Sequence, residues 1–187
     1  MSQNQTKKSM DALVLEAQQN KRTAQAEIFE RLGGKMLGVC RNYIKDWQQA
    51  EEVMLDGFFK ALTKIDQLKH EGAFEGWLRQ IMIRECLSWL RRSKELTADL
   101  NIETLYTLGI PAEVESVWTE QTLAQWIDEL TPGCKVVFLL YEVEGYKHHE
   151  IADLLQISEG ASKSQLSKAR RALQTLYRES KQENYAT

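Results

Sequence analysis

Residues 148–178 read HHEIADLLQISEGASKSQLSKARRALQTLYR, and their pattern is the most informative in the chain. A short helix with an apolar pattern leads into a turn that contains Gly160, and a second helix follows. Apolar side chains recur along the second helix at i, i+3, i+7 and i+10, which places them in one stripe: Leu166, Ala169, Leu173 and Leu176. The pattern predicts two helices joined by a tight turn, as in a helix-turn-helix.

Another face of the second helix is cationic and rich in hydroxyl groups. It carries Lys163, Ser164, Ser167, Lys168 and Arg171, with Arg170 beside them. Between Gly160 and Arg178 there are five Lys or Arg and no Asp or Glu. Such a face suits the major groove of DNA, which presents phosphates and base edges. It also suits the solvated surface of an ordinary all-α protein, so periodicity alone leaves both interpretations open.

Residues in the turn favour the DNA-binding interpretation. Ala152 is small where the two helices approach each other, Ile157 supplies an apolar plug, and Ser158 is a good N-cap for the second helix. Two positions fit less well, because Gln156 stands where glycine adopts a left-handed conformation most easily, and Lys147 is a poor N-cap.

Composition favours helices and excludes several classes of protein. The chain has 187 residues, room for one or two domains, and only two prolines. Its longest apolar run, Val136 to Tyr141, is too short to cross a bilayer, and the N-terminus lacks the apolar core of a signal peptide. Three scattered cysteines without a CxxC motif predict neither disulfides nor a zinc site. We therefore expect a cytoplasmic protein with no membrane insertion, no metal and no cofactor.

The charges are segregated along the chain, although the net charge is −3. Residues 77–94 carry five Lys or Arg and one acid, a net charge of +4, whereas residues 95–130 carry eight acids and no Lys or Arg. Residues 131–178 are basic again. Phosphate binding depends on local charge, so two basic segments flanking an acidic one are compatible with nucleic-acid binding.

The predicted fold is all-α, with two small helical domains joined by an acidic linker, and the second domain contains the helix-turn-helix. Residues 1–22 are a polar N-terminal extension, expected to be a loosely held helix or tail, and residues 23–94 form the first domain. Residues 95–118 form the acidic linker, and residues 119–187 form the second domain.

A patterned helix is predicted from Gln48 to Ile65 in the first domain. Its core-facing stripe consists of Ala50, Val53, Met54, Gly57, Phe58, Ala61, Leu62 and Ile65. Its other face carries Glu51, Glu52, Leu55, Asp56, Phe59 and Lys60. Leu55 and Phe59 there either belong to a protein-docking surface or pack on a neighbouring helix.

The next helix interleaves aromatic and arginine side chains. Phe74, Trp77 and Trp89 alternate with arginines, a mixture that suits single-stranded nucleic acid, because aromatic rings stack on unpaired bases. Trp77, at the start of an apolar helix, is more often a core residue, and Trp89 is undecided.

Three stretches resemble the sigma-70 family of bacterial RNA polymerase sigma factors, extracytoplasmic-function type, over about residues 24–180. QAEEVMLDGFFKAL (49–62) resembles the helix that docks on core polymerase. EGAFEGWLRQIMIRECLSWLRR (71–92) resembles the helix and loop that melt the -10 promoter element. LTPGCKVVFLLYEVEGYKHHEIADLLQISEGASKSQLSKARRAL (130–173) resembles the -35-binding domain. The variants EGWLRQIMI and SEGASKSQLSKAR also resemble the Bacteroidetes branch.

The resemblance implies three sets of binding residues. Those facing core polymerase are Glu51, Glu52, Leu55, Asp56 and Phe59. Those at the melted -10 element are a loop beside a flipped-out base, Lys69, His70, Glu71 and Gly72, and the backbone-binding Arg79, Arg84, Arg91 and Arg92. Those at the duplex -35 element are Lys163, Ser164, Ser167 and Lys168 in the groove, and Arg170 and Arg171 on or near phosphate. The resemblance also implies an anti-sigma partner.

The sequence departs from the family pattern at several of these positions. Glu52 and Leu55 stand where Asp and Gln are usual, Arg84 and Ser88 where Asn and Asp are common, and Ala161 where Thr is frequent. These departures bear on base-level specificity.

Two other functions fit parts of the sequence. A stand-alone helix-turn-helix regulator explains residues 131–178 but leaves the first domain unexplained. An enzyme is disfavoured, because His148, His149 and Glu150 lack HExxH spacing and no cue pairs Cys134 with a base.

Overall fold

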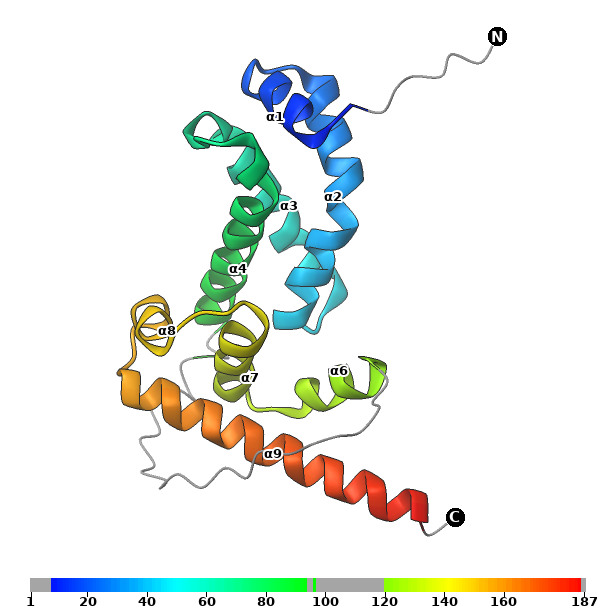
Figure 1. Cartoon of the computed structure of the whole chain (residues 1–187), viewed down its shortest axis with the longest axis vertical. Coiled ribbons are helices and arrows are strands. Elements are labelled where there is room, and N and C mark those ends of the chain that lie inside the picture. The colour runs from blue at the N-terminus through cyan, green and yellow to red at the C-terminus, as the bar shows by residue number, and fades with distance from the viewer. Residues whose placement is uncertain (1–7, 94–95, 97–119, 186–187) are drawn as a thin grey trace. The chain divides into compact units, whose positions relative to one another are not determined.

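The computed structural model describes residues 8–93, 96 and 120–185, and these form helices with no strand among them (Figure 1). The chain divides into two compact units, residues 1–90 and 91–187. The prediction of an all-α fold with two helical domains is confirmed. The predicted acidic linker, residues 95–118, lies outside the described residues except for Leu96.

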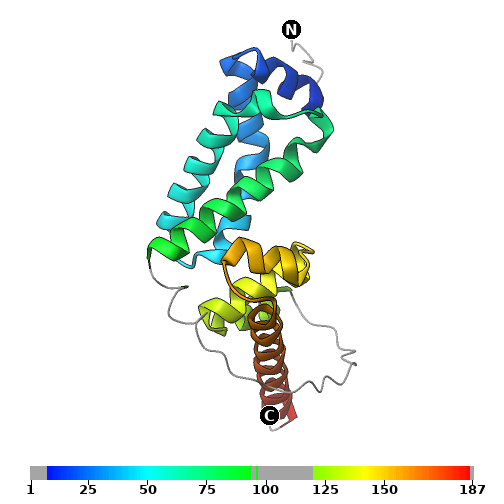
Figure 2. The ribbon, with the colours of Figure 1, turned by 90° about the vertical axis from the view of Figure 1, so that its left-hand side faces the viewer.

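The first unit is a helical bundle closed at one end by a short helix. It consists of α1 (Met10–Gln18), α2 (Arg22–Tyr43), α3 (Trp47–Thr63), the 3-10 turns η1 (Ile65–Gln67) and η2 (Glu71–Ala73), and α4 (Phe74–Arg92). α2, α3 and α4 run alongside one another, and α1 packs against α2, η1 and η2 (Figure 2). Fully buried side chains such as Ile28, Met36, Leu78 and Leu87 fill the space between the helices.

The sequence prediction of a loosely held N-terminus is wrong for α1. Leu13, Val14 and Ala17 are buried, which places the apolar stripe of a nine-residue helix in the core of the unit. Ser9 caps the helix by accepting a hydrogen bond of 3.2 Å from the Ala12 N–H. The polar residues around this stripe hid it from a composition-based prediction.

The predicted core stripe is buried at seven of its eight positions, and Leu62 is half-buried; α3 ends at Thr63, so the buried Ile65 belongs to η1 and not, as predicted from the sequence, to the helix. The stripe allows a close approach between α3 and α4. A Cβ atom built on Gly57 would lie 2.4 Å from Met82 Sδ, so a larger residue at this position would force the end of the fully buried Met82 side chain to shift.

The second unit is built around one long helix. It consists of α6 (Glu120–Glu129), α7 (Pro132–Phe138), the π-helical turn η3 (Leu139–Val143), α8 (His148–Leu155) and α9 (Glu159–Tyr185). α7 and α8 both pack against α9. Leu166 and Ala169 on α9 are buried, and Leu130, Cys134 and Ala169 form a core cluster.

The turn between α8 and α9 has the predicted chemistry. Ser158 Oγ accepts a hydrogen bond of 3.0 Å from the Ala161 N–H, so the predicted N-cap is confirmed. Gln156 adopts a left-handed conformation (φ 57°, ψ 47°) at the C-terminus of α8, and the Ile157 N–H bonds to the Ala152 carbonyl at 3.1 Å. At the start of α8, the Glu150 carboxylate accepts from the Lys147 N–H at 2.7 Å. Within the described residues, no helix is both long and apolar enough to span a membrane.

Candidate functional site

The first candidate surface is the outer face of α3, which we call the α3 face: Glu51, Glu52, Leu55, Asp56 and Phe59. All five side chains are exposed, with Leu55 at 48% and Phe59 at 72% of their full accessible area. The alternative that Leu55 and Phe59 pack on a neighbouring helix of this chain is therefore wrong. The buried stripe on the opposite side of α3 turns this face outward.

The α3 face is longer than the sequence predicted, because Trp47 extends it. Trp47, Glu51, Leu55 and Phe59 follow one another at i+4 spacing and so lie along one side of the helix. Trp47 is 54% exposed, and the Arg41 guanidinium lies 4.7 Å from the centre of its ring. The i+4 register was the signal in the sequence that could have identified Trp47.

The second candidate surface contains the loop between η1 and η2. Lys69, His70 and Gly72 are exposed, and Glu71 is half-buried at the start of η2. The Ala73 N–H donates to the His70 carbonyl at 3.0 Å, which closes the η2 turn. The structure therefore presents the four predicted loop residues on one short, exposed segment directly before α4.

The arginines predicted to contact the -10 element lie on α4. Arg84, Arg91 and Arg92 are exposed, and Arg79 is half-buried. Phe74 is fully buried, and its ring centroid lies 6.0 Å from that of Trp77, but Trp77 is itself half-buried, so it packs beside the core without being enclosed in it. Trp89 is half-buried. α4 thus combines an apolar side, which anchors it in the first unit, with cationic residues that reach solvent.

The third candidate surface is the polar side of α9. Lys163 and Arg171 are exposed, and Ser164, Ser167 and Lys168 are half-buried. Lys163 forms an ion pair of 2.9 Å with Glu159, one turn earlier on the same helix. The predicted apolar stripe of α9 is confirmed at Leu166 and Ala169, which are buried, with Ala169 packed against Cys134 of α7, whereas Leu173 and Leu176 are half-buried.

Arg170 belongs to a polar network that the sequence did not predict. Its Nε donates to Glu142 Oε1 at 2.9 Å, and its guanidinium lies 5.7 Å from the ring centre of Tyr141. Arg170 is half-buried, so Glu142 and Tyr141 hold its side chain against η3. The contact of Arg170 with phosphate stays a prediction. In this structure the guanidinium of Arg170 is hydrogen-bonded to the carboxylate of Glu142.

His148 continues the network across the helix-turn-helix. Its ring stacks on Tyr141 at 4.6 Å between centroids, and its Nδ1 lies 2.9 Å from the hydroxyl of the buried Ser162. Burial lowers the pKa of His148 below its ordinary value of 6.5, and the positive charge of Lys163 lowers it further. The hydrogen bond between His148 and Ser162 joins the start of α8 to the first turn of α9.

A buried polar pair also joins α7 to α9. The Cys134 thiol donates to the side-chain oxygen of Gln165 at 3.0 Å, and both residues are buried. Because Gln165 and Ser162 face the interior, the polar residues of α9 divide into buried ones, which fix its position, and others that reach its outer side.

Comparison with known families matches each unit separately. Residues 28–95 match the model described as "Sigma-70 region 2", and residues 120–173 match "Sigma-70, region 4". Together these matches cover most of the residues that the structure describes.

Several curated proteins are similar along most of this chain. The RNA polymerase sigma-H factor of Pseudomonas aeruginosa is 28% identical over 166 residues, covering 78% of this chain and 83% of that protein. The ECF RNA polymerase sigma factor SigM of Bacillus subtilis is 25% identical, covering 81% of this chain and 93% of its own length. The probable RNA polymerase sigma factor RfaY of Xanthomonas campestris is 28% identical over 73% of this chain, which spans only 38% of that longer protein.

Two solved structures share the fold. CnrH, in complex with the cytosolic domain of CnrY, superposes with a TM-score of 0.50 at 19% identity and covers 90% of this chain and 96% of that one. RpoE, in complex with the anti-sigma factor NepR from Bartonella quintana, superposes with a TM-score of 0.51 at 21% identity, covering 82% and 96%. At these identities the likeness concerns the fold alone.

Proposed function

The chain belongs to the sigma-70 family of RNA polymerase sigma factors, extracytoplasmic-function type, and from this premise we propose how its surfaces divide the work of promoter recognition. The observation that carries the proposal is the presence of a region 2 match and a region 4 match on two separate folded units. Each unit exposes residues of the chemistry that its role requires.

We assign the binding of core polymerase to the α3 face. Three carboxylates surround two large exposed apolar side chains, Leu55 and Phe59, in one unpartnered strip of helix. Apolar side chains exposed in this way lose water-accessible area on docking, and the surrounding acids select a basic partner surface. Trp47 lengthens the strip by one turn beyond the residues predicted from the sequence.

We assign the binding of promoter DNA to two surfaces: the loop Lys69–Gly72 together with α4, and the outward side of α9. The loop and the arginines of α4 bind the melted -10 element, where a flipped base must be captured and the backbone neutralised. The outward side of α9 enters the major groove at the duplex -35 element, because its inward side is buried against α7. The protein is then a non-enzymatic, cytoplasmic specificity subunit.

The stand-alone regulator remains the second candidate. The helix-turn-helix of α8 and α9, with its cationic second helix, would bind DNA in a stand-alone regulator as well as in a sigma factor. It leaves the α3 face without a function, and it requires tight binding to duplex DNA by the protein alone.

Run-off transcription with sigma-free core polymerase tests the proposal. The template is a pool of promoters from the source genome, and we expect discrete transcripts that depend on this protein. Asp56→Arg should weaken binding to core polymerase, whereas Glu30→Arg, the same charge change at an exposed position of α2, should not. Absence of transcripts and of co-migration with core, together with retention of duplex DNA by the protein alone, would support the stand-alone regulator.

We further propose control by an anti-sigma partner and a Bacteroidetes-like origin. One of the two solved neighbours is a sigma factor bound to an anti-sigma factor, and the other, CnrH, is bound to the cytosolic domain of CnrY, which supports the first idea. Such a partner at equimolar concentration should prevent holoenzyme formation, and an inhibitor that leaves holoenzyme intact would contradict it. Transcription with Bacteroidetes core polymerase, compared with an enterobacterial core on matched promoters, tests the second.

A further inference from the structure

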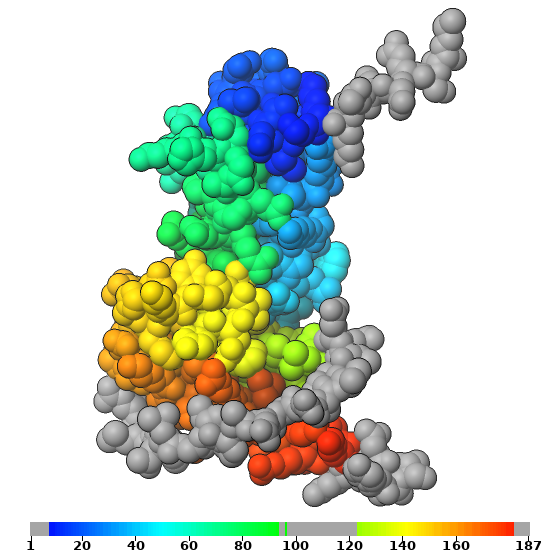
Figure 3. Space-filling model, in the orientation of Figure 1, coloured from blue at the N-terminus to red at the C-terminus, as the bar shows by residue number. Residues whose placement is uncertain are grey.

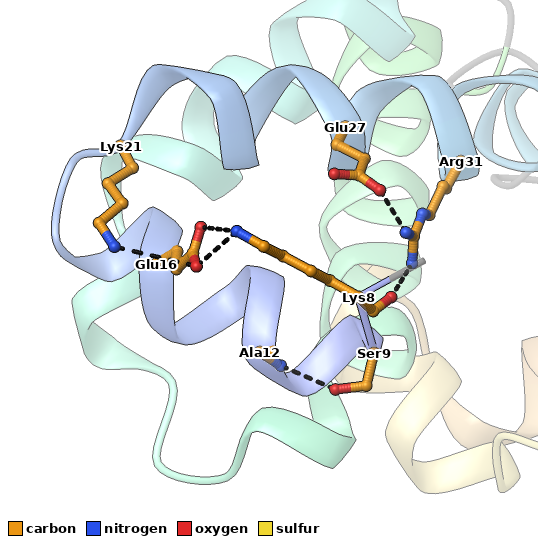
Figure 4. Close-up of polar contacts among 7 residues, drawn as sticks. All are labelled: Lys8, Ser9, Ala12, Glu16, Lys21, Glu27 and Arg31. Atoms are coloured by element: carbon orange, nitrogen blue, oxygen red, sulfur yellow. Dashed lines mark hydrogen bonds and ion pairs between the residues drawn. The ribbon is translucent and has the colours of Figure 1, made fainter. Parts of the chain in front are cut away.

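α1 is fastened to the first unit along its whole length. Its apolar stripe, Leu13, Val14 and Ala17, is buried. Figure 4 shows polar contacts at its N-terminal end: Arg31 Nη1 on α2 donates to the Lys8 carbonyl at 2.6 Å, and Lys8 Nζ pairs with Glu16 at 2.7 Å. The Lys8–Glu16 pair is exposed and adds little stability, so burial of the stripe is what holds the helix.

The last residue of α1 reaches into the segment that precedes the -10 loop. Gln18 Nε2 donates to the Ile65 carbonyl at 3.0 Å and lies 3.4 Å from the Leu68 carbonyl. These carbonyls begin and end the η1 turn, whose own bond runs from the Leu68 N–H to the Ile65 carbonyl at 3.2 Å. One primary amide supplies two hydrogens, so Gln18 serves both acceptors at once.

The next residues along the chain are the predicted reading loop, Lys69 to Gly72. Its beginning is held by Gln18 through Leu68, and its end is the η2 turn, against which α1 also packs. In the space-filling view the atoms of α1 adjoin those of this segment (Figure 3). An exposed loop that is anchored on both sides loses less conformational entropy when it binds.

We propose that Gln18 is a positioning residue for reading the melted -10 strand. By holding the η1 backbone it presets the loop Lys69–Gly72 to receive an unstacked base. The inference rests on the function proposed above and gives α1 a role in it. A captured base must repay the cost of leaving the stack, so a loop that also had to be ordered would capture it more weakly.

Two substitutions of Gln18 remove the donor in different ways. Gln18→Glu keeps the shape but places a carboxylate beside two carbonyl oxygens, and Gln18→Met keeps the volume without any polar group. Gln19→Glu is the matched control, because it makes the same charge change at the adjacent exposed residue. All are assayed as holoenzyme formed from the full chain and core polymerase.

Three measurements are compared: affinity for core polymerase, permanganate reactivity of opened thymines at the -10 element, and competition between promoters that differ at the flipped base. We expect unchanged affinity for core polymerase. The yield of open complexes should fall about two- to tenfold for both Gln18 variants, because water can replace the weaker of the two hydrogen bonds and the net loss is then that of about one. The ratio by which the holoenzyme prefers one flipped base over another in the competition assay should fall by a similar factor. Gln19→Glu should behave as wild type in all three measurements.

A purely structural role would give a different result. Gln18 variants with lowered thermal stability but an unchanged base preference would overturn the proposal, as would open-complex yields equal to those of Gln19→Glu. Wild-type protein that directs no transcription would refute the proposed function itself, and that outcome is visible before any variant is tested.

Discussion

Replacing Gly57 with alanine tests the close approach of α3 and α4. In a helix interior this substitution ordinarily stabilises a protein by about 1 kcal/mol, because alanine restricts the unfolded backbone and favours the helix. At Gly57 the new methyl carbon would lie 2.4 Å from Met82 Sδ and 3.0 Å from Met82 Cε, well inside van der Waals contact. Met82 is fully buried, so its side chain must shift within a packed core.

The magnitude follows from two opposing contributions. Overpacking a core by one methyl group typically costs about 1–3 kcal/mol, and the gain in helix propensity offsets about 1 kcal/mol of it. We therefore expect Gly57→Ala to lower the free energy of unfolding by about 0–2 kcal/mol. Gly38→Ala is the control: Gly38 is exposed inside α2, nothing lies within 4 Å of its added Cβ, and stability should rise by about 1 kcal/mol.

Urea-induced unfolding, followed by tryptophan fluorescence and fitted separately for the two units, measures both variants. A double-mutant cycle isolates the contact: Met82→Ala removes the clashing atoms, so Gly57→Ala should become stabilising by about 1 kcal/mol in that background. If Gly57→Ala stabilised the wild-type protein as much as Gly38→Ala, or had the same effect in both backgrounds, the close approach would be refuted.

Three further predictions concern the second unit. Gln156→Gly should stabilise it by about 0.5–1 kcal/mol in urea unfolding, because φ is 57° there, whereas Gln174→Gly in the interior of α9 should destabilise it. Burial lowers the pKa of His148, so the unfolded state binds the extra proton at a higher pH than the folded state does. Stability should therefore fall as pH drops through about 6.5, and His148→Asn should reduce this dependence in thermal melts. Asp128→Asn should lower the free energy of unfolding by about 1–2 kcal/mol, more than Glu129→Gln does, because Lys135 is only 5% exposed and pairs with Asp128 at 2.7 Å. The loss stays below that of a fully buried ion pair, because the side chain of Asp128 is half-exposed.

Periodicity and capping residues predicted the helices well because these signals are local. The stripe of α3 faces inward as its spacing requires, and Leu166 and Ala169 do the same on α9. Ser158 caps α9 through its own backbone neighbours, three residues away. In each case the interacting residues lie within one or two helical turns of one another, so the local sequence is enough to predict the feature.

The N-terminal helix shows where such reasoning ends. Nothing in the order of residues 10–18 indicates that Gln18 bonds to the Ile65 carbonyl, 47 positions further along the chain. The exposure of Leu55 and Phe59 was equally open, because an apolar residue outside the main stripe either packs on another helix or faces solvent. Only the packing of α2 and α4 on the opposite side of α3 decides between them.

The order of the amino acids was therefore enough to predict the helical class, the division into two units, the inward stripes and the family resemblance. The tertiary structure alone decided that α1 is part of the first unit, that Glu142 holds Arg170, and that His148 bonds to Ser162 across the turn. The physical reason is range. Helix periodicity and caps act between neighbours in the chain, whereas these contacts join residues 14 to 47 positions apart, which meet only after the helices have packed.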